Sequence, residues 1–434
     1  MVGVYSGNRR EIVEICSGVL RAGIIPVPIN PLLTRPEVAY ILEDCGAGLL
    51  FTDRAIEVPP TVTAVVTLGD AYERCLIDAG EVDISDVTLT RPMHYTSGTT
   101  GRPKGVYVPP ASEDVAAEES VAFRELWGLD SSEVHLVCSP LAHSAPLRFS
   151  MRTLEAGGAV VVQERFEPLT TLAAIELFGI TSAFMVPTHL ERILHHERKE
   201  LARHDLSTMR LLAHAGAPIR EETKEAAMKL FPEGALWEFY GSTEGQATRI
   251  SGAEWLQRRG SVGRALPHTD VTVADTAGTP LSPGEPGAIW IAAPGEPFVY
   301  WGDEEKTRRA WRDGAFTVGD LGWLDGDGYL YLTGRVNDVI ITGGVNVYPQ
   351  EVEAAIGSHP AVSEVMVYGT PSEEWGQEVC ARVILHLDAK LDTDDLRMWI
   401  RERLAGYKTP RTIEFVRDLP RTATGKVKRP QPDL

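Results

Sequence analysis

Buried strands and amphipathic helices alternate along the first fifty residues, and this alternation is the strongest constraint on the fold. Short apolar runs at residues 2–5, 24–29 and 48–51 predict strands. Between them, residues 11–22 and 37–43 carry apolar side chains at helical spacing. Strands that alternate with helices form parallel sheets covered by helices. The sequence therefore predicts an α/β fold with parallel, doubly wound sheets.

The size and charge of the chain limit what it can be. At 434 residues it is too long for one compact core and should hold two or more domains. Its formal net charge of −19 argues against a general binder of nucleic acid or membrane surfaces, because both ligands are anionic. The five cysteines are scattered and lack metal-ligand spacing. With no signal-peptide pattern or long uncharged apolar run in the sequence, we expect a cytoplasmic protein.

A loop of glycines, hydroxyl side chains and one lysine occupies residues 95–105. Its sequence, YTSGTTGRPKG, has no apolar side chain after the tyrosine and no helical or strand period. Glycines let backbone N–H groups approach phosphate oxygens, hydroxyls donate hydrogen bonds, and a lysine adds a point charge. A flexible linker would need neither Pro103 beside a lysine nor a strand that resumes at residues 106–108. We therefore predict a phosphate-binding loop, although its spacing is not that of a Walker motif.

This loop resembles the signature loop of the adenylate-forming superfamily, which includes acyl-CoA synthetases, luciferases and peptide-synthetase adenylation domains. Further motifs of the superfamily follow in the same order over nearly the whole chain, which makes coincidence untenable. The resemblance implies that the loop holds the phosphates of ATP. The residues concerned are Thr96, Ser97, Gly98, Thr99, Thr100, Gly101 and Lys104.

Two later segments resemble the adenine- and metal-binding segments of that superfamily. Residues 215–218, AGAP, match a turn of small residues against which adenine lies, and residues 240–244, YGSTE, match a segment beside the phosphates. In isolation, the first segment would be better explained as a tight turn, and the second could equally be a surface turn. In the superfamily, the threonine reaches a phosphate oxygen and the glutamate holds magnesium. The implied nucleotide contacts are Gly216, Ala217, Pro218, Tyr240, Gly241, Thr243 and Glu244, with Glu244 as the metal ligand.

A third segment resembles the part of the superfamily that binds ribose. Residues 317–320 are TVGD and residues 332–335 are LTGR. The resemblance implies that Asp320 accepts hydrogen bonds from the ribose hydroxyls and that Arg335 contacts ribose or phosphate. A carboxylate suits this role because its two oxygens can accept from neighbouring hydroxyl groups.

Beyond Arg335 the pattern changes to a small α+β unit of about a hundred residues, which is an ordinary domain size. We predict a large nucleotide- and acyl-binding domain over residues 1–336 and a C-terminal domain over residues 337–434. In the superfamily the second domain is a mobile lid that rotates between adenylation and thioester formation. By resemblance, Asn337 is the hinge residue, and Gly343 and Gly344 line the channel for coenzyme A.

The last motif, LPRTATGKV at residues 419–427, resembles the closing motif of the lid. Its lysine, Lys426, stands at the position of the adenylation lysine, which stabilises charge in the transition state. A lysine near a chain end is ordinarily exposed to solvent. The surrounding motif is what favours a catalytic role here.

Residues 140–144, PLAHS, resemble the superfamily's acyl-binding segment. His143 matches, whereas Ala142 stands where the superfamily commonly has an aromatic ring. Loss of a ring leaves space in the pocket wall, so we expect a larger or branched acid in contact with Ala142, His143 and Ala215. His143 could equally be a hydrogen-bonded histidine near a strand end.

Taken together, the motifs imply an AMP-forming acyl-CoA synthetase that uses ATP, Mg²⁺ and coenzyme A on a hydrophobic, bulky carboxylic acid. One alternative is an enzyme that only converts a supplied acyl-adenylate to the thioester, working with a separate adenylating partner. Two departures from the superfamily suggest it: the hinge residue Asn337 is neutral where Asp or Lys is usual, and the segment that usually precedes residue 1 is missing from this sequence. Another alternative loads a carrier protein. A non-catalytic nucleotide binder ranks last because Lys426, Glu244 and Asp320 are all present. A homo-oligomer is left open.

Overall fold

The computed structural model describes residues 1–80, 90–96, 103–342, 345–372, 375–421 and 427–430. The chain divides into two compact units. Unit 1 comprises Met1–Asp270 and Ala292–Phe316, and unit 2 comprises Val271–Ile291 and Thr317–Leu434. Unit 2 also contains sequence that precedes residue 337, so the boundary between residues 336 and 337 stays a prediction. None of the helices in the described part of the chain is long and apolar enough to span a bilayer.

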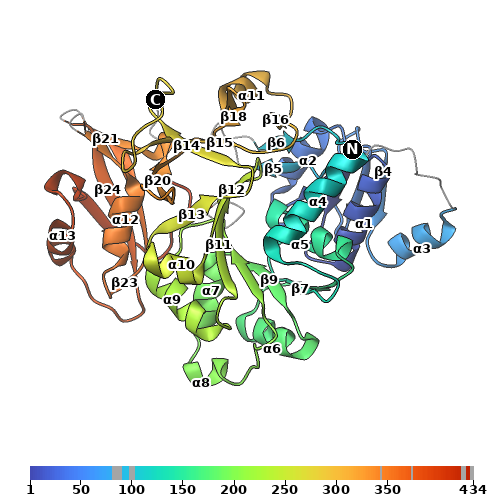
Figure 1. Ribbon diagram of the computed structural model, residues 1–434, viewed down its shortest axis with the longest axis horizontal. Helices are drawn as coiled ribbons and strands as arrows, with labels where there is room; N and C mark the ends of the chain where they lie inside the picture. Colours follow the sequence, from blue (N-terminus) through green and yellow to red (C-terminus); the bar gives the residue numbers. More distant parts are fainter. Residues whose placement is uncertain (81–89, 97–102, 343–344, 373–374, 422–426, 431–434) are drawn as a thin grey trace. The chain divides into compact units, whose positions relative to one another are not determined.

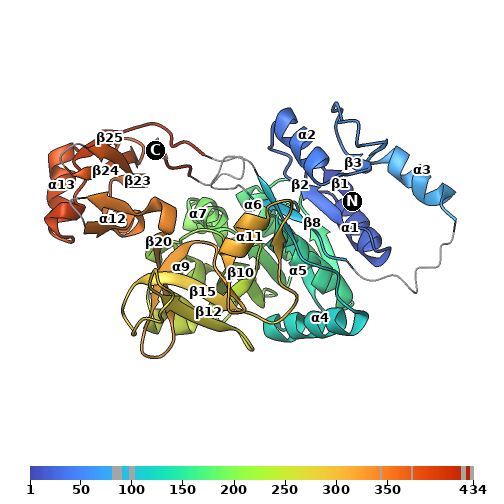
Figure 2. The same cartoon turned by 90° about the horizontal axis from the view of Figure 1, so that it is seen from above.

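Unit 1 begins with a four-stranded parallel sheet in the order β2-β1-β3-β4. Its elements are β1 (Val2–Tyr5), α1 (Arg10–Arg21), β2 (Pro26–Ile29), α2 (Arg35–Asp44), β3 (Leu49–Thr52), β4 (Ala64–Thr67) and α3 (Asp70–Asp78). Neighbouring residues of β1 face opposite sides: Val4 packs in the cluster that contains α1, and Tyr5 in the cluster that contains α2. Helices therefore cover both faces of this sheet (Figure 2), and the predicted α/β alternation is confirmed.

The second sheet of unit 1 runs β8-β7-β9-β10-β11-β12-β13, with β8 to β11 parallel and the last two strands antiparallel. The strands are β7 (Val134–Val137), β8 (Ala159–Val162), β9 (Ser182–Met185), β10 (Leu211–His214), β11 (Leu236–Gly241), β12 (Gln246–Ser251) and β13 (Ser261–Ala265). The helices are α4 (Glu113–Trp127), α5 (Ser144–Glu155), α6 (Pro168–Phe178), α7 (Pro187–Leu194), α8 (Arg198–Leu201), α9 (Glu221–Leu230) and α10 (Gly252–Gln257).

The parallel strands of this sheet bury side chains on both faces, because helices cover both. In β10, Leu212 packs in the core shared with α6, α7 and α9, whereas Leu211 and Ala213 pack in an aromatic cluster shared with α4 and α5. Alternate residues of a strand point to opposite faces, so a short continuous apolar run satisfies both sets of helices. Figure 1 shows the two groups of helices.

Unit 1 also contains a small antiparallel sheet with the strand order β16-β6-β5. It consists of β5 (His94–Thr96), β6 (Lys104–Tyr107) and β16 (Val299–Tyr300), and it is followed by α11 (Glu304–Ala310), β17 (Trp311–Arg312) and β18 (Ala315–Phe316). The sheet joins the segment around the predicted phosphate loop to a segment almost two hundred residues later in the chain.

Unit 2 is a smaller α+β body. Its first part contains β14 (Asp270–Ala274), β15 (Gly287–Ala292), β19 (Asp320–Leu324), β20 (Leu330–Arg335) and the 3₁₀ turn η1 (Val336–Asp338). Its second part is a sheet ordered β22-β21-β24-β23, with β25 parallel to β24, packed against two helices. These elements are β21 (Ile340–Thr342), β22 (Val345–Val347), α12 (Pro349–Gly357), β23 (Val362–Ser372), β24 (Gly376–Leu385), α13 (Thr393–Arg401), η2 (Gly406–Lys408) and β25 (Thr412–Phe415).

Gly263 of β13 offers a test of this packing. Its φ is +99°, and a Cβ atom there would lie 2.0 Å from the backbone carbonyl oxygen of Arg249. Gly234 has a similar φ of +80° but nothing within 4 Å of its Cβ position. Gly234→Ala should lower the free energy of unfolding by about 1–2 kcal/mol, because alanine is strained at this φ. Gly263→Ala should lower the free energy of unfolding by the same strain and by roughly 1–3 kcal/mol more for the clash, because a backbone carbonyl cannot move aside.

The measurement is the urea midpoint of unfolding, followed by tryptophan fluorescence for both variants and the wild type. Equal shifts for the two variants would contradict the close approach of β13 to β12.

Candidate active site

Three predicted site segments leave the same edge of the second sheet in unit 1. Strands β7, β9, β10 and β11 are parallel neighbours, so their carboxyl ends lie along one edge. The segments that follow β7, β10 and β11 are residues 138–143, 215–218 and 242–244. The structure thus brings the acyl, adenine and metal segments of the prediction to one edge, which is where α/β sheets usually bind ligands.

The adenine segment is shaped by small residues. Ala215 is buried, whereas Gly216, Ala217 and Pro218 are exposed directly after β10. Gly216 has a φ of +91°, a left-handed conformation that favours glycine. This turn therefore presents a low surface that a flat ring can approach.

The neighbouring segment forms a tight turn between β11 and β12. The Ser242 N–H donates to the Gly245 carbonyl oxygen at 2.8 Å. A Cβ atom on Gly241 would lie 2.7 Å from that same carbonyl oxygen, so only glycine fits there. Tyr240 is buried at the end of β11, and Thr243 and Glu244 are half-buried beyond it.

The base of the predicted phosphate loop is fixed to the end of α2. Thr96 and Lys104 lie opposite each other in β5 and β6. The Tyr95 hydroxyl donates to a carboxylate oxygen of Asp44 at 2.6 Å, and the Trp301 indole N–H donates to the Asp44 carbonyl oxygen at 2.9 Å. Ser97, Gly98, Thr99, Thr100 and Gly101 lie outside the described residues. The structure therefore places both ends of the loop but not its centre.

A line of charged and polar groups connects this loop to Glu244. The Lys104 ammonium lies 3.5 Å from a carboxylate oxygen of Asp303, which follows β16. The Lys306 ammonium lies 3.8 Å from the centre of the Tyr300 ring, and the Tyr300 hydroxyl donates to Glu244 Oε1 at 2.8 Å. Burial lowers the pKa of Lys306, and nearby Glu244 and Asp303 oppose that shift. Two cations and two carboxylates are thus grouped in unit 1.

Sequence reasoning missed Tyr300, Asp303 and Lys306. Tyr300 is separated from Glu244 by 56 residues, and no spacing rule links the two. The only signal was the run YWGDEEKT itself, which also fits an ordinary turn and helix start. The pairing of β16 with β6 is what brings these residues to the loop.

Glu244 fits the role of a magnesium ligand. Tyr300 fixes one of its carboxylate oxygens, and no partner is found for the other among the described residues. Within the described part of the chain, no group of three or more His, Cys, Asp or Glu side chains could hold a metal. A site with one carboxylate suits Mg²⁺, which commonly takes its remaining ligands from water and substrate phosphates.

The acyl segment is held by a neutral histidine. His94 Nδ1 lies 3.0 Å from the carbonyl oxygen of Ala142, and burial lowers the pKa of His94 to about 4. At neutral pH this ring is therefore uncharged, and its Nδ1–H donates to that carbonyl. His143 is the N-cap residue of α5, without a side-chain capping hydrogen bond. Ala215 packs in the aromatic cluster with Phe149 and other aromatic side chains.

The predicted ribose residues lie together in unit 2. Asp320 and Arg335 are opposite each other in β19 and β20, and Arg335 Nε is 2.8 Å from Asp320 Oδ1. Asn337 lies in η1 directly after β20. Gly343, Gly344 and Lys426 lie outside the described residues. The roles of all these positions stay predictions.

Protein-family models match most of the chain. The model described as AMP-binding enzyme matches residues 1–301, and the model described as AMP-binding enzyme C-terminal domain matches residues 351–426. The chain belongs to the AMP-binding enzyme family. The predicted membership of the adenylate-forming superfamily is confirmed, and the chain falls in the class of AMP-forming acid–thiol ligases, whose cofactors are ATP, Mg²⁺ and coenzyme A.

Relatives and solved structures agree with this family. A feruloyl-CoA synthase from an Amycolatopsis species is 36% identical over 98% of this chain and 87% of that protein. An indoleacetate–CoA ligase from Aromatoleum aromaticum is 33% identical over 97% of this chain and 85% of that protein. The o-succinylbenzoate CoA synthetase of Bacillus subtilis, solved with its acyl-adenylate intermediate, has a TM-score of 0.86 and 28% identity. That match covers 98% of this chain and 86% of that one.

We expect Tyr300→Phe to weaken binding of Mg·ATP about tenfold, because one hydrogen bond to a charged carboxylate is lost. Binding of ATP with EDTA present should change little, since Glu244 acts through the metal. Isothermal titration calorimetry measures both affinities. Tyr107→Phe is a matched control, because Tyr107 is a half-buried tyrosine of β6. Equal weakening with and without Mg²⁺ would contradict the role of Tyr300.

The neutral His94 predicts a pH dependence of stability. Its folded-state pKa of about 4 lies below the ordinary value of 6.5, so the unfolded chain takes up a proton first as the pH falls. Above pH 6.5 the neutral His94 does not lower the free energy of unfolding. Between pH 6.5 and pH 4 that free energy falls, by at most about 1.4 kcal/mol per pH unit. His94→Gln should therefore lose stability less steeply than the wild type in urea unfolding at pH 7, 6 and 5.

The exposed His195 provides the control, and His195→Gln should keep the wild-type slope. A His94→Gln slope equal to that of the wild type would show that His94 is not held neutral.

Proposed function

We propose that this chain activates a hydrophobic, bulky carboxylic acid as its acyl-adenylate and transfers the acyl group to coenzyme A. The observation that carries this proposal is the connection from Lys104 of the phosphate loop to Glu244 through Asp303, Lys306 and Tyr300. Such a group of cations beside a single available carboxylate suits a magnesium triphosphate.

In the first step, a carboxylate oxygen of the acid attacks the α-phosphorus of ATP, and the bond to pyrophosphate breaks. In the second, the thiolate of coenzyme A attacks the acyl carbon, and AMP leaves with the shared oxygen. When bound, Mg²⁺ neutralises phosphate charge. Lys104 and Thr243 hold phosphate oxygens, Glu244 holds the metal, and Lys426 stabilises charge on the reacting carboxylate and α-phosphate. No residue forms a covalent bond with the substrate, so positioning and electrostatics supply the catalysis.

The residues around the acyl segment favour an aromatic acid of moderate length. Ala142 and Ala215, both predicted acyl contacts, have small side chains. Behind Ala215, the side chains of Phe149, Phe184 and Phe239 pack against one another with ring centroids 5.9–6.4 Å apart. This buried cluster limits the depth behind Ala215, which disfavours a long straight chain. Relatives named for feruloyl and indoleacetate substrates support the same class.

A second candidate function has one observation in its favour. A fatty acid–[acyl-carrier-protein] ligase of Streptomyces coeruleorubidus is 32% identical over 98% of this chain and 85% of that protein. The acceptor of the acyl group is therefore worth testing directly, and a phosphopantetheinylated carrier protein is the alternative to coenzyme A.

The experiment measures pyrophosphate release from ATP with each of a panel of fatty, aryl and polycyclic acids, with and without coenzyme A. We expect release with aryl acids before coenzyme A is added, and thioester only afterwards. Lys426→Ala should lower the rate at least about a hundredfold, as expected for loss of a transition-state charge contact. Lys428→Ala is the matched control and should behave as the wild type.

The possible outcomes separate the candidates. Thioester formed only on a phosphopantetheinylated carrier protein would identify the second function. Thioester formed from supplied acyl-adenylate, with no pyrophosphate release from any acid, would identify an enzyme of the second half-reaction only. Release that does not depend on Lys426 would overturn its assigned role.

A further inference from the structure

A cavity of about 320 Å³ lies at the opposite end of the strands that carry the candidate active site. Its lining residues are Leu126, Trp127, Gly128, Glu133, Arg210, Leu211, Trp237 and Arg249. Leu211 begins β10, whereas Ala215 follows its end, so the two sites are roughly 13 Å apart along that strand at about 3.3 Å per residue. The cavity is therefore distinct from the nucleotide segments.

Arg249 of β12 supplies a cation to this cavity. Its guanidinium lies over the Trp237 ring at 4.8 Å and near the Trp127 ring at 5.7 Å, and it donates to the Leu126 carbonyl oxygen. Among the described residues no carboxylate lies within 4.0 Å of Arg249, and the acidic group whose charge acts on it from farther away is Glu254. Burial lowers the pKa of Arg249 and the distant Glu254 opposes that shift, so an anion in direct contact within the cavity would stabilise the charged guanidinium further.

Trp127 is a second lining residue with a polar group that lacks a described partner. It lines the cavity, is only 6% exposed, and its indole N–H has no hydrogen-bond partner among the described residues. An indole N–H can only donate, and a buried donor usually has an acceptor. The residues that line the cavity therefore include a cation, Arg249, and a buried donor without a described partner, Trp127.

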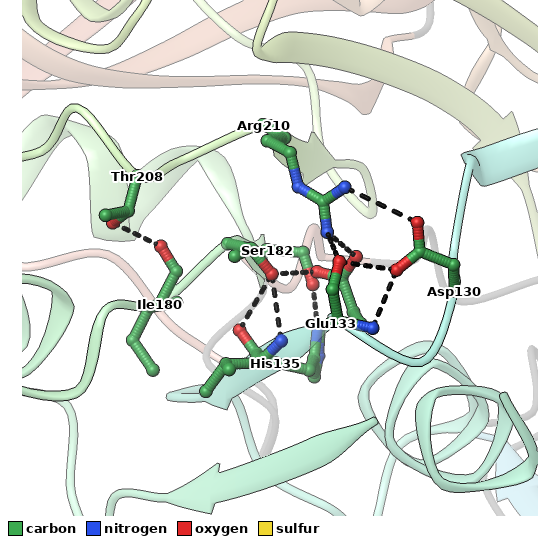
Figure 3. A network of polar contacts seen from close by, with 10 residues as sticks. Asp130, Glu133, His135, Ile180, Ser182, Thr208 and Arg210 are labelled. Atoms are coloured by element: carbon green, nitrogen blue, oxygen red, sulfur yellow. Dashed lines mark hydrogen bonds and ion pairs between the residues drawn. The ribbon is translucent and has the colours of Figure 1, made fainter. Parts of the chain in front are cut away.

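The acidic residue in the wall is already neutralised. Glu133 is 2% exposed, and its carboxylate binds Arg210 at 3.0 Å and the Thr181 hydroxyl. Figure 3 shows Arg210 between Glu133 and Asp130. Arg210 forms ion pairs with both of these carboxylates. Arg249 is therefore the lining cation that could bind an anionic ligand directly.

We propose that this cavity is a second ligand site, for a small organic anion with a planar apolar body such as an aromatic carboxylate. The carboxylate accepts from Arg249, and the ring packs against Leu211 and Trp237. The size is suitable, because a cavity of about 150 Å³ holds benzene. This inference concerns residues outside the candidate active site and does not depend on the proposed reaction.

The test is equilibrium dialysis of the full chain with trans-cinnamate as the probe. Arg249→Gln should lose one equivalent of bound cinnamate, whether the candidate active site binds the probe or not. Arg192→Gln is the matched control, since Arg192 also lies over an aromatic ring, that of Phe166, at 5.0 Å. It should bind as many equivalents as the wild type. An unchanged number of equivalents in folded Arg249→Gln would overturn the proposal.

A second measurement needs no substitution. The wild-type chain is irradiated with 4-azidocinnamate, and the modified peptides are mapped. We expect adducts in residues 126–128 and at Trp237, and these should be lost when excess cinnamate is present. Adducts confined to residues 139–147 or 215–218 would show binding at the candidate active site alone and would overturn the second site.

Discussion

The parallel pairing of β7, β9, β10 and β11 is the constraint on which unit 1 depends. Because these strands run in one direction, every turn that follows them lies at one edge, and every segment that precedes them lies at the other. The predicted nucleotide segments lie at the first edge, and the cavity lined by Arg249, Trp127 and Trp237 lies at the second. A buried core with helices on both faces keeps this separation fixed.

The sequence was sufficient to predict the fold class and the family. Motifs such as YGSTE are local, because the end of a strand and the turn that follows it are written in consecutive residues: Tyr240 and Gly241 end β11, and residues 242–244 follow it. Asp320 and Arg335 were predicted separately, and the pairing of β19 with β20 joins them in an ion pair. The roles of Lys426 and of the central phosphate-loop residues rest on the resemblance alone.

Contacts between distant segments could not be predicted. The bond from Tyr300 to Glu244 needs the pairing of β16 with β6, and the position of Arg249 between two tryptophans needs β12 beside β11. No sequence spacing predicts either pairing, because the partner of a strand depends on how the whole core packs. Burial, which sets His94 neutral, is likewise a property of the packed molecule and not of its neighbours in sequence.

Asp303 holds two partners with its two carboxylate oxygens. One oxygen accepts the Lys306 N–H and caps α11, and the other faces the Lys104 ammonium. A phosphate that takes Lys104 therefore replaces one anionic partner by another, while the cap of α11 stays in place. Under the proposed function, Lys104 therefore has an anionic partner both before and after a phosphate binds, and the N-terminal cap of α11 does not have to open.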